Sequence, residues 1–170
     1  MISQGLWKNG DCLQIDSVQF GDDCVAILKV TYPPQSYLDD QSIVPHVSIE
    51  KREPILGVIS NEPNLPKVGL CPSHSVDFTW NSEILRCQVG EGSGWDGFGY
   101  VAVSRVADDY LYWVAFFERS NGFDQVYIKD NSVIATPYLG WEYVFDLAAP
   151  ERIKIRTSKS KETDQTGQGS

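Results

Sequence analysis

An alternation of apolar and polar side chains with a period of two residues constrains the fold of this chain most strongly. It is clearest in residues 75–80, SVDFTW, and it recurs through most of the second half of the chain. Because successive side chains of a β-strand point to opposite faces, this period predicts strands, whereas helical periodicity is almost absent. We therefore expect a mainly β protein, either an antiparallel sandwich or a barrel-like sheet, built from consecutive hairpins with little helix.

Short turn sequences between the alternating runs predict where the chain reverses. Asn9-Gly10 separates GLWK from DCLQI, which is the strongest local pattern for a type I′ hairpin. Asp130-Asn131 predicts another two-residue hairpin, and Asn81-Ser82 can join the runs on either side of it.

The first half of the chain is less regular. Residues 24–32 are apolar almost throughout and predict a central strand that stops at Pro33. Residues 44–52 are interrupted by Pro45, which suits an edge strand. The remaining expectations are a short strand at residues 55–59, an irregular connection at residues 60–75, and helical turns near residues 35–41 and 148–151.

A length of 170 residues suits one domain, which we place at residues 1–157. Residues 158–170 contain no apolar side chain, so we expect a disordered polar tail. No run approaches the roughly 18 apolar residues of a membrane span, and the N-terminus lacks the pattern of a signal peptide. A cytoplasmic protein is the corresponding expectation.

The charge balance restricts the partners. Fourteen basic residues against 23 acidic ones give a formal net charge of −9. Such a surface repels nucleic acids and anionic membranes, and a charged partner is expected to be basic.

Residues 92–105, GSGWDGFGYVAVSR, contain the spacing GxGxxG of nucleotide-binding loops. A dinucleotide site requires a helix after these glycines, but the pattern that follows is that of a strand. In a protein kinase a lysine follows the VAV motif, and here the position holds Ser104. The glycines therefore predict a turning loop, with Gly99 at a bulge or a close backbone crossing.

The thiols raise the question of a metal site. Cys71, His74 and Cys87 have the spacing of an incomplete zinc site, and no fourth ligand can be assigned from the sequence. We expect reduced cysteines and neither a metal nor another cofactor, although the sequence leaves open whether these three side chains converge.

Nothing in the sequence indicates catalysis. The chain has two histidines and none of the local signatures of a serine, cysteine or zinc hydrolase. Acidic doublets such as Asp108-Asp109 lie at expected turns, where neighbouring side chains diverge. We therefore expect a binding protein and no enzyme.

Residues 110–117, YLYWVAFF, are apolar at nearly every position and predict a central strand covered on both faces. Strict alternation assigns Tyr110, Tyr112, Val114 and Phe116 to one face and Leu111, Trp113, Ala115 and Phe117 to the other. The chain holds more aromatic area than a small core requires, so part of it is expected on the surface.

The aromatic, hairpin-rich block at residues 110–147 resembles segments of small acidic bacterial immunity proteins, the antidotes of polymorphic or contact-dependent toxins. The resemblance is to the class, since no particular family and no individual residue carries over. It implies a cytoplasmic antidote that binds a basic toxin domain and occludes its active site.

We assign the binding surface to an aromatic and acidic set of residues. Its members are Trp95, Asp96, Asp108, Asp109, Tyr138 and Trp141. The alternative function is a small-ligand or carbohydrate-binding β module, in which aromatic rings stack on the ligand.

Overall fold

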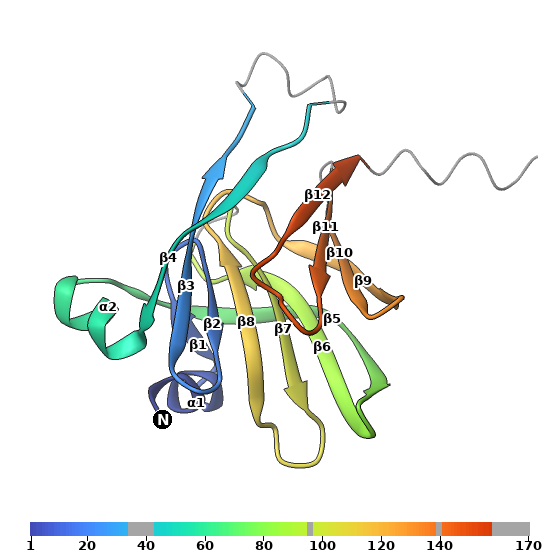
Figure 1. The fold of residues 1–170 in the computed structure, drawn as a ribbon, viewed down its shortest axis with the longest axis horizontal. Helices are drawn as coiled ribbons and strands as arrows, with labels where there is room; N and C mark the ends of the chain where they lie inside the picture. Colours follow the sequence, from blue (N-terminus) through green and yellow to red (C-terminus); the bar gives the residue numbers. More distant parts are fainter. Residues whose placement is uncertain (34–42, 95–96, 139–140, 158–170) are drawn as a thin grey trace, which may run out of the picture.

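The computed structural model describes residues 1–33, 43–94, 97–138 and 141–157. Strands account for 59% of these residues and helices for 10%, in two antiparallel sheets that do not close into a barrel (Figure 1). The expected mainly β fold of consecutive hairpins is therefore confirmed, in its open form. The predicted tail at residues 158–170 lies outside the described residues.

The larger sheet has eight strands in the order β1-β5-β6-β7-β8-β2-β3-β4, and the smaller has the order β12-β11-β10-β9. The elements of the first half are α1 (Ile2–Lys8), β1 (Asp11–Leu13), β2 (Ser17–Phe20), β3 (Cys24–Thr31), β4 (His46–Pro54), α2 (Ile55–Asn61) and β5 (Lys67–Trp80). Those of the second half are β6 (Glu83–Gly92), β7 (Gly99–Arg105), β8 (Leu111–Phe117), β9 (Phe123–Lys129), β10 (Ser132–Pro137), β11 (Trp141–Asp146) and β12 (Lys154–Thr157).

Two of the expected hairpin turns are confirmed. Asp130 and Asn131 have φ values of 50° and 60° and join β9 to β10, and Asn81 and Ser82, at 49° and 65°, join β5 to β6. Positive φ at both central residues defines the type I′ turn, whose twist matches that of the paired strands. At both places the two turn residues were therefore sufficient to predict the hairpin.

The hairpin predicted at Asn9-Gly10 is wrong, because the residues before it form helix α1. The Asn9 N–H bonds to carbonyl groups of the last helical turn, and Gly10 has a φ of 74°. Gly in the left-handed region after a helix is a common C-terminal cap, so the same dipeptide serves either structure.

Two other expectations in the first half are corrected. Residues 55–59 belong to α2, which buries Ile55 and Val58 on one side while Leu56 stays exposed. The irregular connection is shorter than expected, because β5 already begins at Lys67, where β1 pairs with it. The edge strand after Pro45 is confirmed as β4, at the end of the larger sheet.

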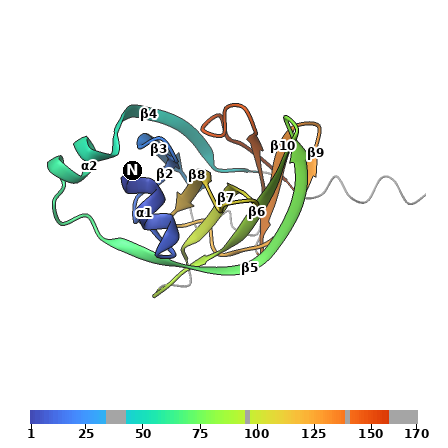
Figure 2. The same ribbon diagram turned by 90° about the horizontal axis from the view of Figure 1, so that it is seen from below.

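Strand β8 is covered on both faces, as expected, and so is its neighbour β7 (Figure 2). One face packs against the smaller sheet, where Trp113 stacks on Phe145 with ring centroids 5.5 Å apart. The other face packs under α1, where Trp7 joins the fully buried Tyr100 and Phe116 in one apolar cluster. Much of the aromatic area that we expected on the surface therefore lies in these cores.

A β-bulge corrects the predicted faces at the start of β8. The register pairs Val103 with Trp113 but Ser104 with Leu111, so Tyr112 is the extra residue. Leu111 consequently shares a cluster with Val114 and Phe116, and Tyr112 packs beside Trp113. Strict alternation cannot anticipate this inversion, because a bulge shifts the period by one residue.

Candidate functional site

The sheet has two contrasting ends along β7 and β8. We call residues 105–111 and the side chains bonded to them the turn end. We call residues 97–99 and 118–122, with the side chains packed against them, the glycine end. Since β7 has seven residues, roughly 20 Å separate the two ends.

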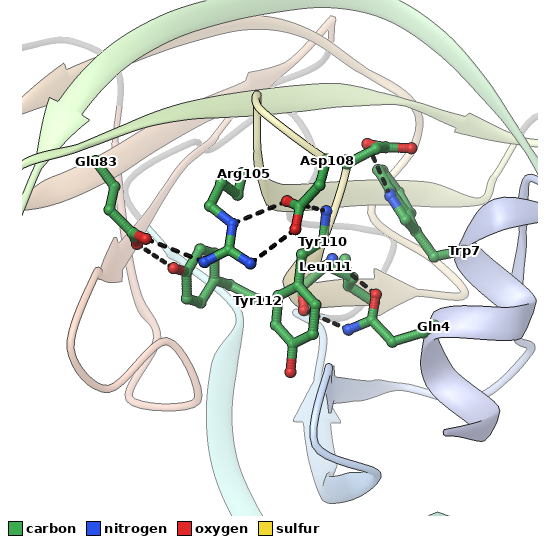
Figure 3. A network of polar contacts seen from close by, with 9 residues as sticks. Gln4, Trp7, Glu83, Arg105, Asp108, Tyr110, Leu111 and Tyr112 are labelled. Atoms are coloured by element: carbon green, nitrogen blue, oxygen red, sulfur yellow. Dashed lines mark hydrogen bonds and ion pairs between the residues drawn. The ribbon is translucent and has the colours of Figure 1, made fainter.

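At the turn end, Arg105 organises the carboxylates (Figure 3). Its Nε and Nη2 donate to the two oxygens of Asp108, each at 2.8 Å, and its Nη1 donates to Glu83 at 3.0 Å. The other oxygen of Glu83 accepts a short hydrogen bond from Tyr112. The guanidinium group also lies 5.3 Å from the ring centre of Tyr110. Each carboxylate is thus bound within the molecule.

Helix α1 closes the same end from the other side (Figure 3). The Gln4 side chain donates to the carbonyls of Gly21 and Leu111 at 3.1 and 2.8 Å, and it accepts the Leu111 N–H at 2.9 Å. Trp7 Nε1 donates to Asp109 at 3.1 Å. These bonds hold the helix against β8. They also occupy one carboxylate oxygen of Asp109.

The pKa directions follow from these bonds. The Arg105 guanidinium holds the pKa of the Asp108 carboxyl below its usual value. The pKa of Glu83 is lowered first by the Tyr112 hydroxyl and then by Arg105. Both carboxylates are therefore held in their ionised form by partners inside the molecule.

At the glycine end the backbone segments approach closely. A Cβ on Gly99 would lie 2.2 Å from the carbonyl oxygen of Asn121, so no side chain fits there. The Asn121 N–H bonds to the Gly97 carbonyl at 2.9 Å, and the Tyr138 N–H to the Gly122 carbonyl at 3.4 Å. The close crossing expected at Gly99 is confirmed. It brings together the segments before β7, after β8 and after β10.

Beside this crossing lies a hollow of about 200 Å³ where the two sheets meet. The Ser73 hydroxyl, at the bulge of β5, joins the sheets there by donating to the Phe123 carbonyl at 2.6 Å. The lining residues are Cys71, Pro72, Ser73, Glu91, Gly122, Phe123, Asp124 and Tyr138.

Two carboxylates of this hollow differ from those of the turn end. Glu91 and Asp124 are exposed, and within the described residues neither makes a hydrogen bond or an ion pair through its side chain. Tyr138, with 54% of its surface exposed, lies beside them. Two free carboxylates next to an exposed ring can receive a lysine or arginine side chain, by charge and by cation–π contact.

Two further acids at the glycine end have raised pKa values. Burial raises the pKa of Asp16, although its carboxylate accepts the Glu118 N–H at 2.8 Å. Burial, and then the charge of Asp16, raise the pKa of Glu118. The Arg119 guanidinium lies 5.0 Å from the ring centre of Tyr32. Its positive charge lowers the pKa of Asp16, but by less than burial raises it.

The structure divides the predicted site residues between the two ends. Tyr138 lines the hollow, whereas Trp141, at the start of β11, is half-buried against the core between the sheets and does not line it. Asp108 and Asp109 lie at the turn end and are bonded to Arg105 and Trp7.

Trp95 and Asp96 lie outside the described residues, between the described Gly94 and Gly97. Sequence reasoning missed Glu91 and Asp124, which are 33 positions apart in the sequence and carry no local signal.

The cysteines that raised the question of a metal do not share one environment. Cys71 is exposed beside the hollow, whereas Cys87 is fully buried between the sheets, where burial raises the pKa of its thiol. Within the described part of the chain, no three histidine, cysteine or acidic side chains are grouped as metal ligands, and the four cysteines are unpaired.

Comparisons with known proteins add no relative. No protein-family model matches the chain, and neither a curated protein nor a solved structure is significantly similar to it. Among the described residues, no helix is long and apolar enough to cross a membrane.

Proposed function

We propose that the protein is an antidote of the immunity type, which binds a basic toxin domain and covers its active site with the glycine end. The observation that carries the proposal is the hollow beside Tyr138, where Glu91 and Asp124 have no intramolecular partner among the described residues. Occlusion requires a complementary surface and no catalytic group, which agrees with the absence of catalytic motifs from the sequence.

In this proposal the aromatic ring and the carboxylates of the hollow contribute to binding in different ways. The exposed ring of Tyr138 supplies apolar area that is desolvated on contact, and anchors of this kind dominate binding energies. The free carboxylates attract the partner over several ångströms and pair with its cations. The net charge of −9 extends this attraction to the whole molecule.

Capture from a lysate of the source cell tests the proposal. The immobilised parent protein is compared with a Glu91→Gln/Asp124→Asn variant, and bound proteins are identified by mass spectrometry. A Glu62→Gln/Asp130→Asn variant is the matched control, because it removes two exposed charges elsewhere on the surface.

We expect the parent and the control to retain one basic protein in stoichiometric amount and the Glu91→Gln/Asp124→Asn variant to lose most of it. Equal capture by all three proteins would remove the hollow from the binding surface. The absence of any basic protein would contradict the antidote function.

A further inference from the structure

A second cavity lies near the turn end of the larger sheet, away from the glycine end, and Tyr112 is one of its lining residues. It is half open to solvent and has a volume of about 280 Å³ between the β5–β6 hairpin, the start of β8 and the segment after β11. Its lining residues are Phe20, Trp80, Leu85, Val103, Tyr112, Trp113, Leu147, Ala148 and Pro150. Four of these nine residues are aromatic, and none carries a charge.

The polar atoms around this cavity restrict its ligand. The Tyr112 hydroxyl donates its hydrogen bond to Glu83, whose other oxygen is bonded to Arg105 (Figure 3). The remaining polar side-chain groups of the lining are the indole N–H groups of Trp80 and Trp113, which donate and do not accept. A sugar presents many hydroxyl groups and would leave most of them unpaired here, which costs binding free energy.

We propose that this cavity binds a small neutral aromatic molecule with at most a few hydrogen-bond acceptors. The volume of about 280 Å³ lies near the lower limit of about 300 Å³ for typical ligand pockets, so it suits a compact ligand of two or three linked rings. Small-molecule sites are typically concave and apolar with a few polar groups, and this lining has that composition. The site is independent of the glycine end and of the partner proposed for it.

A polypeptide is the less suitable occupant. Its backbone brings N–H groups that require acceptors, and the lining side chains contribute no free acceptor within the described residues. The carboxylates that could serve, Glu83 and Asp108, are both bonded to Arg105. A compact molecule without donors fits this chemistry better.

Fluorescence titration with the naphthalene dye prodan tests the proposal, because this neutral molecule carries a carbonyl acceptor and no hydrogen-bond donor, becomes brighter in apolar surroundings and accepts energy from tryptophan. We expect one saturable site with a dissociation constant on the order of 10–100 µM. Ala148→Phe places a ring at the exposed mouth of the cavity and should weaken binding at least about tenfold. Ala107→Phe is the matched control, because Ala107 is exposed and does not line the cavity.

A second measurement does not depend on how the variants fold. Methyl NMR spectra of the parent protein should show probe-induced shifts at Leu85, Val103 and Leu147. The methyl groups of Ile55 and Val58, which belong to α2 and to a separate apolar cluster, should not shift. The proposal would be overturned if probe binding did not saturate, or if Ala148→Phe and Ala107→Phe bound the probe equally. It would also be overturned if the shifts were confined to other methyl groups, or if simple sugars displaced the probe.

Discussion

The turn end and the glycine end of the larger sheet differ in how their carboxylates are bound. At the turn end, Arg105 holds Asp108 and Glu83, and the pKa values of both acids are lowered. At the glycine end, Asp16 and Glu118 have raised pKa values, and Glu91 and Asp124 have no cation partner within the described residues.

The comparison shows that the number of acidic residues does not identify a binding surface. Acids that already have partners lose those bonds when a protein partner takes them, so they contribute less to association. Acids without partners lose only their hydration. On this reasoning the turn end stabilises the fold, and the glycine end is available for binding.

The largest expected effect is at the turn end. Gln4→Leu leaves the backbone groups of Leu111 and the Gly21 carbonyl without their buried partner, so the free energy of unfolding should fall by about 3 kcal/mol. Urea denaturation measures this change. Gln14→Leu, at a half-buried position outside this network, is the control and should cost far less. A loss below about 1 kcal/mol for Gln4→Leu would mean that α1 is held by apolar packing alone.

A second substitution tests how tightly the glycine end is built. Gly99→Ala would place a Cβ against the Asn121 carbonyl and the Ser120 hydroxyl, and we expect a loss of about 2 kcal/mol or more in the free energy of unfolding. Gly5 lies inside α1, and a methyl group there would meet no other described part of the molecule within 4 Å, so Gly5→Ala should gain about 0.5–1 kcal/mol in the free energy of unfolding. Equal unfolding free energies for the two variants would refute the close crossing.

The two ends should respond to pH in opposite directions. The lowered pKa values of Asp108 and Glu83 contribute stability above their ordinary values of 3.8 and 4.5, and this stability is lost as the pH falls through the still lower folded values. The raised pKa values of Asp16 and Glu118 act in reverse, so their ionisation reduces stability as the pH rises from the ordinary values through the folded values.

Asp16→Asn separates these contributions, because the asparagine oxygen can still accept the Glu118 N–H. The variant should have a higher melting temperature than the parent at pH 7, and the difference should shrink as the pH falls towards 4. A difference that grows towards acid pH would show that the Asp16 carboxylate is stabilised in the folded protein.

Sequence patterns were informative where the determining contacts are local. The turns at Asn81-Ser82 and Asp130-Asn131 depend on two residues and their immediate strands, and both were predicted. Asn9-Gly10 failed because a glycine with positive φ suits the end of a helix as well as a type I′ turn. Asn9 has a φ of −84° here, and the preceding helix is held by the packing of Trp7 against the sheet.

Features that depend on distant partners could not be predicted. Gln4 forms two of its three side-chain hydrogen bonds with Leu111, 107 positions away, and no pattern near either residue indicates the contact. The free state of Glu91 and Asp124, and the bound state of Asp108, likewise follow from the arrangement of strands rather than from residue type. The sequence supplied the acidic and aromatic composition of the surface, and the fold separates the two ends.

The association rate of the captured basic partner, measured across a salt titration, tests the central claim most directly. We predict that Glu91→Gln/Asp124→Asn slows association several-fold at low salt, that the difference narrows at high salt, and that Asp108→Asn/Asp109→Asn associates nearly as fast as the parent. Slower association of the Asp108→Asn/Asp109→Asn variant, with the Glu91→Gln/Asp124→Asn variant unaffected, would contradict the account and place the binding surface at the turn end.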